Sequence, residues 1–238
     1  MALTKALSFS GGKDSLACLF LLEPLWNELV VVWGNTGAAH PSTHEMMERV
    51  RKRVPHFREV KSNQPAFIAE YGYPVDVLPT RRTRFGQQLD DRGGRKFVDW
   101  QSCCATNLWV PMYQAMKDMG IRTVYRGQKK ADMIRSPIKS GHTEDGITYI
   151  FPLEDWTDAK VFEYLGERVP DHYLTGEKTS RDCVNCTAYL HENQQRIAAL
   201  PAQVKAEVIE VLADLRACMQ ESVDYIDDII GGRNGIVR

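Results

Sequence analysis

Two pairs of cysteines give the clearest chemical signal in this 238-residue chain. Cys103 and Cys104 are adjacent, and Cys183 and Cys186 form a Cys-x-x-Cys pair much farther along the sequence. Four thiolates that converge on one centre bind soft metals, either zinc or an iron–sulfur cluster. Adjacent cysteines are less usual in zinc sites, where Cys-x-x-Cys pairs dominate. The spacing therefore predicts one metal centre and leaves the metal open.

A second motif, SGGKDS, follows a short apolar segment near the start of the chain and precedes a helical pattern. Glycines allow the backbone to approach a phosphate closely, and the N-terminus of a helix attracts anions. Hydroxyl and ammonium groups donate to phosphate oxygens, and a carboxylate here holds a metal ion or the loop itself. The loop is not a Walker A motif, because the G-x-x-x-x-G-K spacing is missing. The candidate phosphate-binding residues are Ser10, Gly11, Gly12, Lys13, Asp14 and Ser15.

The elements that must position these residues alternate between strand and helix. Residues 6–9 indicate a first strand, and the continuous apolar run at 29–33 is typical of a buried parallel strand. A helical pattern follows each of them. Such an alternation implies right-handed βαβ units and a parallel sheet. The predicted strands are 6–9, 29–33, 121–127 and 148–151, and the predicted helices are 13–22, 41–52, 105–120, 157–165 and segments of 201–230.

We therefore predict an α/β fold, a Rossmann-like open parallel sheet flanked by helices, with a small C-terminal helical extension. Residues 1–175 are the expected nucleotide-binding domain. Residues 176–238 are the expected cysteine-containing helical region, which packs on the first domain.

Composition and charge limit the functional classes. Apolar residues make up 43% of the chain and charged residues 26%, which are ordinary values for a globular protein. The formal net charge of −1 excludes a global electrostatic footprint for nucleic acid. The stretch 80–96 is either a solvated surface loop or a local guide for a polyanionic acceptor. Its arginines are Arg81, Arg82, Arg84, Arg92 and Arg95.

The expected location is the cytoplasm. No stretch approaches the length of a membrane span, and the first residues lead into a predicted strand instead of a signal peptide. In a reducing compartment, six cysteines are ligands, reactive thiols or core residues more often than disulfides. Cys18 and Cys218 lie in helical patterns and are expected to be core residues.

The SGGKDS loop resembles the signature S-G-G-x-D-S of the PP-loop adenine-nucleotide α-hydrolases. Within that superfamily the chain is similar to the PAPS reductase-like branch. Residues 35–37 (NTG) resemble its D-T-G, residues 41–43 its P-E-T, residues 100–104 its W-x-x-C-C, and residues 152–158 its P-L-x-D-W-T-D. These matches run from Leu7 to Cys186 in the expected order.

The resemblance implies that the chain binds ATP, or else APS or PAPS, and acts at its α-phosphate, with Mg²⁺ neutralising the leaving group. Residues 35–37 would lie beside the adenine or ribose, whereas residues 152–158 have a purely structural alternative, with Trp156 in the core and Thr157 as a helix cap. The implied catalytic residues are Lys13, Asp14, Ser15 and Lys129. The implied nucleotide-binding residues are Ser8, Ser10, Gly11, Gly12, Lys13, Asp14, Ser15, Asn35, Thr36, Gly37 and Gly127.

The assimilatory APS reductases of this branch bind a [4Fe–4S] cluster through an adjacent cysteine pair and a distant Cys-x-x-Cys pair. By this resemblance the cluster is preferred over zinc or unliganded thiols, and a homodimer is expected. The implied cluster ligands are Cys103, Cys104, Cys183 and Cys186.

The reductase pattern breaks at three places. Those enzymes use a cysteine in a C-terminal E-C-G-L-H motif, whereas this chain ends GGRNGIVR. After the cysteine pair they continue with Arg-Lys, where this chain has Asn107 and Leu108. Lys129 stands where they have the arginine of G-x-R, and lysine lacks the bidentate fork. We therefore expect that the reductase route through an S-sulfocysteine is not used.

Three functions remain open. The preferred one is ATP-dependent adenylation of an acceptor, with nucleic acid among the candidates, followed by sulfur transfer through the cluster or a persulfide of a donor protein. It resembles the PP-loop enzymes that thiolate nucleic acids. The second is reduction of APS or PAPS with an external thiol donor. The third is a non-catalytic nucleotide-binding subunit whose cluster is structural or redox-sensing.

Overall fold

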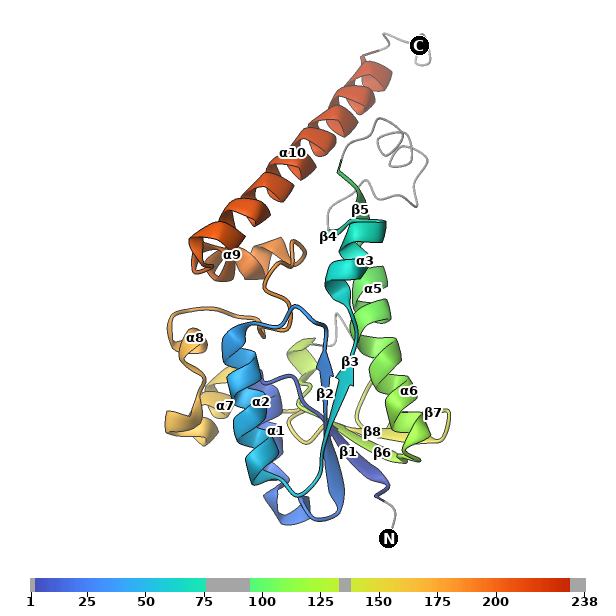
Figure 1. Cartoon of the computed structure of the whole chain (residues 1–238), viewed down its shortest axis with the longest axis vertical. Helices are drawn as coiled ribbons and strands as arrows, with labels where there is room; N and C mark the ends of the chain where they lie inside the picture. The colour runs from blue at the N-terminus through green and yellow to red at the C-terminus, as the bar shows by residue number, and fades with distance from the viewer. Residues whose placement is uncertain (1–2, 76–94, 133–137, 232–238) are drawn as a thin grey trace. The chain divides into compact units, whose positions relative to one another are not determined.

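The computed structural model divides into two compact units (Figure 1). The first comprises Met1–Asn63 and Thr106–Val184, and the second comprises Gln64–Ala105 and Asn185–Arg238. The division at residue 175 that the sequence suggests stays a prediction. The residues that the structure describes are 3–75, 95–132 and 138–231.

A six-stranded sheet forms the centre of the first unit. Its strands are β1 (Lys5–Ser8), β2 (Leu29–Asn35), β3 (Phe57–Lys61), β6 (Thr123–Arg126), β7 (Thr143–Glu144) and β8 (Ile147–Ile150). Their order is β3-β2-β1-β6-β8-β7, and every neighbouring pair is parallel except β7 and β8. β1 thus lies in the interior of the sheet, and the loop that follows it opens at the carboxyl edge, where open α/β sheets bind ligands.

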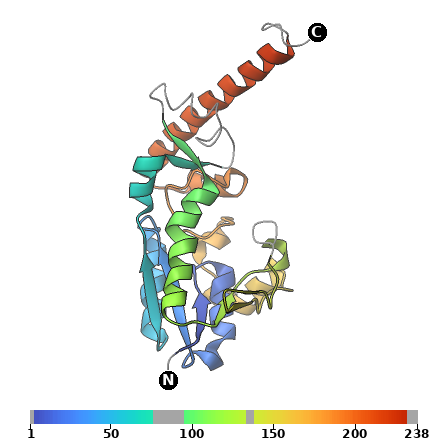
Figure 2. The same ribbon diagram turned by 90° about the vertical axis from the view of Figure 1, so that its right-hand side faces the viewer.

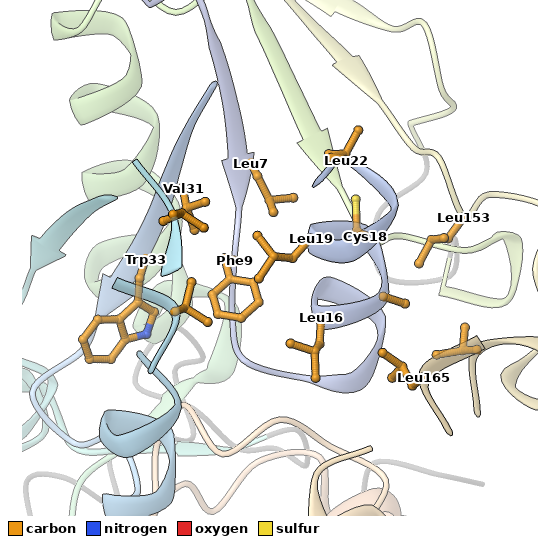
Figure 3. Close-up of a cluster of buried hydrophobic side chains, with 14 of the residues drawn as sticks. Leu7, Phe9, Leu16, Cys18, Leu19, Leu22, Val31, Trp33, Leu153 and Leu165 are labelled. Carbon is orange, nitrogen blue, oxygen red and sulfur yellow. The ribbon is translucent and has the colours of Figure 1, made fainter. Parts of the chain in front are cut away.

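Helices α1 (Lys13–Leu21), α2 (Pro41–Arg53) and α7 (Asp158–Leu165) supply the core on one face of this sheet. Figure 3 shows Leu7, Phe9 and Val31 beside Leu16 and Leu19 of α1, all of them almost fully buried. This packing fixes α1 against the sheet and so holds its N-terminus at the carboxyl end of β1.

Helix α6 (Val110–Asp118) covers the opposite face (Figure 2). Its residues Met112 and Met116 pack with Ala6, Val32 and Val124 of the strands. Because side chains alternate along a strand, neighbouring residues of β1 face different helices. The first unit also contains α8 (Asp171–Leu174) and the 3-10 turns Glu23–Leu25, Lys130–Asp132 and Gly166–Arg168.

The second unit combines a small sheet with helices. Its elements are α3 (Gln64–Tyr71), β4 (Tyr73–Val75), β5 (Phe97–Asp99), α5 (Trp100–Cys104), α9 (Leu190–Ala198) and α10 (Ala202–Ile230). β4 and β5 are parallel. Val211 and Leu215 of α10 pack on Val75 and Phe97 of these strands. The N-terminal half of α10 therefore belongs to the core of this unit, while Ile230 at its end is 71% exposed.

The predicted fold class is confirmed, and two predicted helices differ from the observed ones. The helix expected from residue 105 begins earlier, at Trp100, because the Asp99 side chain caps it by accepting the Ser102 N–H at 2.8 Å. It changes to π-helical geometry over Ala105–Trp109 before α6. The segments expected within 201–230 form one helix of 29 residues. Within the described residues, no helix is long and apolar enough to cross a membrane.

Candidate active site

The SGGKDS loop turns sharply from β1 into α1. Gly11 has a φ of +79°, which a residue with a Cβ rarely adopts. Gly12 is the N-cap residue of α1, and within the described chain no side chain caps the helix there. The first backbone N–H groups of α1 are therefore oriented toward the carboxyl edge of the sheet, as an anion site requires.

Two serine hydroxyls tie this loop together. Ser15 Oγ donates to the Gly12 carbonyl oxygen at 3.0 Å and accepts the Ser10 N–H at 3.3 Å. The Gly12 N–H donates to Ser10 Oγ at 3.3 Å. These local bonds hold the loop in shape, and the hydroxyl groups can exchange them for bonds to a phosphate.

Two lysines and two aspartates, which we call the charge cluster, meet at the start of α1. Lys13 Nζ lies 3.0 Å from Asp14 Oδ2 and 2.9 Å from Asp158 Oδ1. Lys129 Nζ lies 2.6 Å from Asp14 Oδ1 and 3.1 Å from Asp158 Oδ1. The lysine side chains are 8% and 3% exposed, whereas that of Asp158 is 61% exposed. The cluster is electrically neutral, and its most accessible member is a carboxylate.

The protonation states follow from these contacts. Burial lowers the pKa of Lys129, but the hydrogen bond and charge of Asp14, with Asp132 and Asp158, outweigh it and leave the pKa raised. Burial raises the pKa of Asp158, but the two lysines outweigh it and leave the pKa lowered. Lys129 and Asp158 are therefore both charged at neutral pH.

Gly127 allows the chain that leads to Lys129 to pass close to the loop. A Cβ at Gly127 would lie 2.5 Å from the Asp14 carbonyl oxygen and 2.8 Å from the Ser15 nitrogen, both of them backbone atoms of α1. The chain after β6 can thus pass α1 closely only with glycine at this position. Ser8, also implied by resemblance, pairs with Arg126 across β1 and β6, on the other face of the sheet from α1.

The NTG turn closes the end of β2. The Asn35 side chain accepts the Gly37 N–H at 3.0 Å and donates to Glu59 Oε1 at 2.7 Å. Thr36 Oγ1 donates to the Asp182 carbonyl oxygen at 2.9 Å and accepts from Cys183 Sγ at 3.3 Å. The turn expected beside the nucleotide thus contacts the chain segment that contains Cys183.

The four cysteines expected at one metal centre are divided between the units. Cys183 belongs to the first unit, and Cys103, Cys104 and Cys186 belong to the second. Cys103 is buried with Phe67 beside it. Among residues 3–75, 95–132 and 138–231, no group of three or more histidine, cysteine, aspartate or glutamate side chains could hold a metal ion. The four-cysteine cluster therefore stays a prediction.

Other expectations have mixed outcomes. Cys18 is fully buried in the core, as expected, and burial raises the pKa of its thiol to about 12. Arg95, expected to guide a polyanion, pairs with Asp214 at 2.6 Å, and its guiding role stays a prediction. Trp156 packs beside the core of α1 and Thr157 caps α7, as the structural alternative for this motif predicts. The other arginines of the 80–96 stretch, Arg81, Arg82, Arg84 and Arg92, lie outside the described residues.

Sequence reasoning missed two members of the site. Asp158 was visible in the sequence as the last residue of PLEDWTD, but only the fold brings it to Lys13, 145 residues away. Tyr173 had no motif. Its buried hydroxyl would lie 3.0 Å from a Cβ at Gly12, and its ring lies 5.7 Å from Lys13 Nζ. Tyr173 of α8 thus lies against the SGGKDS loop and covers one side of it.

A cavity of about 510 Å³ lies beside the loop in the first unit, between α1, α2 and the chain around α8. Gly11 lines one part of it, and His172 and Arg181 line another. His172 Nε2 is buried and has no hydrogen-bond partner among the residues that the structure describes. Burial, then the charge of Arg181, lowers the pKa of His172 to about 4, against the opposing charges of Glu177 and Asp171.

This lowered pKa predicts a loss of stability in acid. His172 is neutral in the folded chain, and at a pH below the ordinary histidine pKa it gains a proton when the chain unfolds. Its contribution to the free energy of unfolding is therefore complete above about pH 6.5 and is lost as the pH falls toward 4. Between pH 7 and pH 4.5 the melting temperature of His172→Phe should therefore fall by about 5 °C less than that of the wild type. Calorimetry at both pH values checks this, and parallel curves for the two proteins would contradict it.

Comparison with known proteins gives one family. The model of the phosphoadenosine phosphosulfate reductase domain matches residues 4–188. An adenosine 5'-phosphosulfate reductase of Burkholderia cepacia is 26% identical over 138 residues, which are 55% of this chain and 48% of that protein. A phosphoadenosine 5'-phosphosulfate reductase of Serratia proteamaculans is 24% identical over 162 residues, which are 68% and 60%. The chain thus spans about half to three fifths of the length of these relatives.

Among solved structures, phosphoadenylyl-sulfate (PAPS) reductase from Candida auris in a phosphate complex is 18% identical to the chain, with a TM-score of 0.49. The match covers 74% of this chain and 80% of that one.

Proposed function

The chain belongs to the phosphoadenosine phosphosulfate reductase domain family, and from this membership we propose that it is a PP-loop enzyme that adenylates an acceptor and prepares it for sulfur transfer. An acceptor oxygen attacks the α-phosphorus of ATP, the bond from that phosphorus to the bridging oxygen breaks, and pyrophosphate leaves. A sulfur nucleophile from a donor protein then displaces AMP from the acceptor. Nucleic acid is one candidate acceptor.

The observation that supports this proposal most directly is the pair of buried ammonium groups at the loop. Lys13 and Lys129 both lie within about 3 Å of the same two carboxylates, so one phosphate group can contact both lysines. Charge that develops on a departing pyrophosphate is stabilised most where cations are fixed in place and shielded from water. Ser10, Ser15 and the N-terminus of α1 supply further donors.

Two cofactors belong to the proposal. Asp14 is the residue that would hold Mg²⁺ beside the leaving group, in exchange for one of its lysine contacts. A [4Fe–4S] cluster on Cys103, Cys104, Cys183 and Cys186 would supply sulfur or electrons, and no step above depends on it. Iron and acid-labile sulfide assays after anaerobic purification, run beside Cys103→Ser, test the cluster: about four of each per chain, lost in the variant, would support it.

Reduction of APS or PAPS is the second candidate, because relatives of this chain are named as reductases of these nucleotides. The same loop and lysine pair would then bind the adenylyl sulfate. An external thiol would attack its sulfur, AMP or its 3'-phosphorylated form would leave, and a second thiol would release sulfite.

One experiment separates the two candidates. The chain is supplied either with α-labelled ATP and nucleic acid, or with APS or PAPS and a thioredoxin-type donor. Pyrophosphate release with label transferred to the nucleic acid would support adenylation, whereas sulfite release would support reduction. Nucleotide binding without either product would contradict both and favour a nucleotide-binding subunit.

The neutral charge cluster makes a prediction for this site. An incoming phosphate must take the position of the exposed Asp158 carboxylate between the two lysines. Asp158→Asn should therefore bind pyrophosphate about tenfold more tightly than the wild type in calorimetry without divalent ions. Asp155→Asn is the matched control, because Asp155 pairs with the exposed Lys130. If Asp158→Asn instead bound pyrophosphate more weakly than the wild type, and did so only when Mg²⁺ is present, Asp158 would be a metal ligand.

A further inference from the structure

Arg126, the last residue of β6, is a cation without a carboxylate partner in the described part of the chain. Its guanidinium carbon lies 4.6 Å from the centre of the Tyr149 ring. The side chain is partly buried, and burial lowers the pKa of the guanidinium against the opposing effect of Tyr149. This differs from the charge cluster, in which each lysine contacts both Asp14 and Asp158.

The strand register fixes where Arg126 lies. It pairs with Ser8 across β6 and β1, at the carboxyl edge of the sheet. Alternation along the strands puts these two residues on the same face as Val124 and Ala6, whose side chains belong to the core under α6. Arg126 and Ser8 therefore lie on the opposite face of the sheet from the charge cluster, at the same edge.

An unpaired cation that is partly withdrawn from water is unfavourable for folding, and the Tyr149 ring compensates it only in part. Such a group persists where a ligand supplies the missing charge. The planar guanidinium fork matches two oxygens of a tetrahedral oxyanion, which an ammonium group cannot do. Ser8 adds a hydroxyl donor beside it, at the edge where ligands of open α/β sheets bind.

We propose that Arg126, with Ser8, binds a tetrahedral oxyanion of the adenine nucleotide that the charge cluster does not hold. The oxyanion is either a sulfate or an additional phosphate, since both present two oxygens to the guanidinium fork. This inference rests on the proposed function, because it assumes an adenine nucleotide at the loop. It assigns the selection among such nucleotides to the α6 face of the sheet.

The test measures the affinities of the wild type and Arg126→Gln for AMP, APS, ATP and adenosine 3',5'-bisphosphate by calorimetry. We expect the affinity of one oxyanion-bearing nucleotide to fall on the order of 100-fold and that of AMP to change little. A fall for APS identifies a sulfate, a fall for the bisphosphate identifies a 3'-phosphate, and a fall for ATP identifies an outer phosphate. Arg126→Lys keeps the charge without the fork and should lose about tenfold.

Arg122→Gln is the matched control, because Arg122 precedes the same strand at the opposite edge of the sheet. Removing an uncompensated cation should also raise the melting temperature of Arg126→Gln while its binding weakens, a combination that a merely structural role would not produce. Unchanged affinities for all four nucleotides, or an equal loss that includes AMP, would overturn the proposal. A wild type that binds none of them would instead overturn the proposed function, and this inference with it.

Discussion

Lys129→Met is expected to lower nucleotide turnover about 1000-fold, in whichever of the two assays the wild type is active. Lys129 is buried, its raised pKa keeps it charged, and its ammonium group contacts both carboxylates of the charge cluster. Methionine has a similar length but no charge, so a phosphate at the loop would meet only one fixed cation. Steady-state kinetics and nucleotide binding check the result.

Two variants separate this effect from a loss of folding. Lys130→Met is the matched control, because Lys130 is the next residue, is 66% exposed and pairs with Asp155 outside the cluster. It should keep wild-type turnover. The double variant Lys129→Met with Asp158→Asn restores electrical neutrality and should regain thermal stability while its turnover stays low. Recovered turnover in the double variant would show that Lys129 serves the fold and not the phosphate.

The sequence predicted the loop and the sheet because both depend on short-range patterns. A strand, two glycines and a helix start lie within a few residues at 6–15, and period-2 or period-3.6 apolar spacing locates the neighbouring elements. The loop motif itself pointed to Lys13, whereas Lys129 was found only through the resemblance, because it stands where the reductases have the arginine of G-x-R. Sequence reasoning could not bring Asp158 or Tyr173 to the loop, because those contacts depend on how α7 and α8 pack on the sheet.

The second unit was harder to predict for the same reason. β4 and β5 have three residues each, too short for a recognisable alternation, and they pair with one another across the stretch 76–94. α10 reads as broken segments because only its first half has a buried partner, whereas its later apolar residues, such as Ile226 and Ile230, are exposed. The sequence also did not predict a role for Arg126. A single arginine at the end of a strand suggests a binding site only once the structure shows that no described carboxylate pairs with it.

Gly127→Ala is expected to destabilise the chain by about 3 kcal/mol and to abolish phosphate binding at the loop. A methyl group at Gly127 would approach the Asp14 carbonyl oxygen to 2.5 Å and the Ser15 nitrogen to 2.8 Å. Neither atom can move alone, because both belong to the backbone of the first turn of α1. The helix start must shift, and with it the N–H groups that face the phosphate. Such a loss corresponds to a fall of about 10 °C in the melting temperature.

Gly34→Ala is the matched control for this prediction. Its Cβ would lie 2.4 Å from Leu108 Cδ1, an equally short approach, and 3.2 Å from Met112 Cγ and Sδ, but all of these atoms belong to flexible side chains. Rotation of Leu108 relieves the overlap, so the expected loss is about 1 kcal/mol and pyrophosphate binding stays unchanged. If Gly127→Ala lost no more stability than Gly34→Ala and kept its pyrophosphate binding, the close approach of the chain at Gly127 to α1 would not be what shapes the phosphate loop.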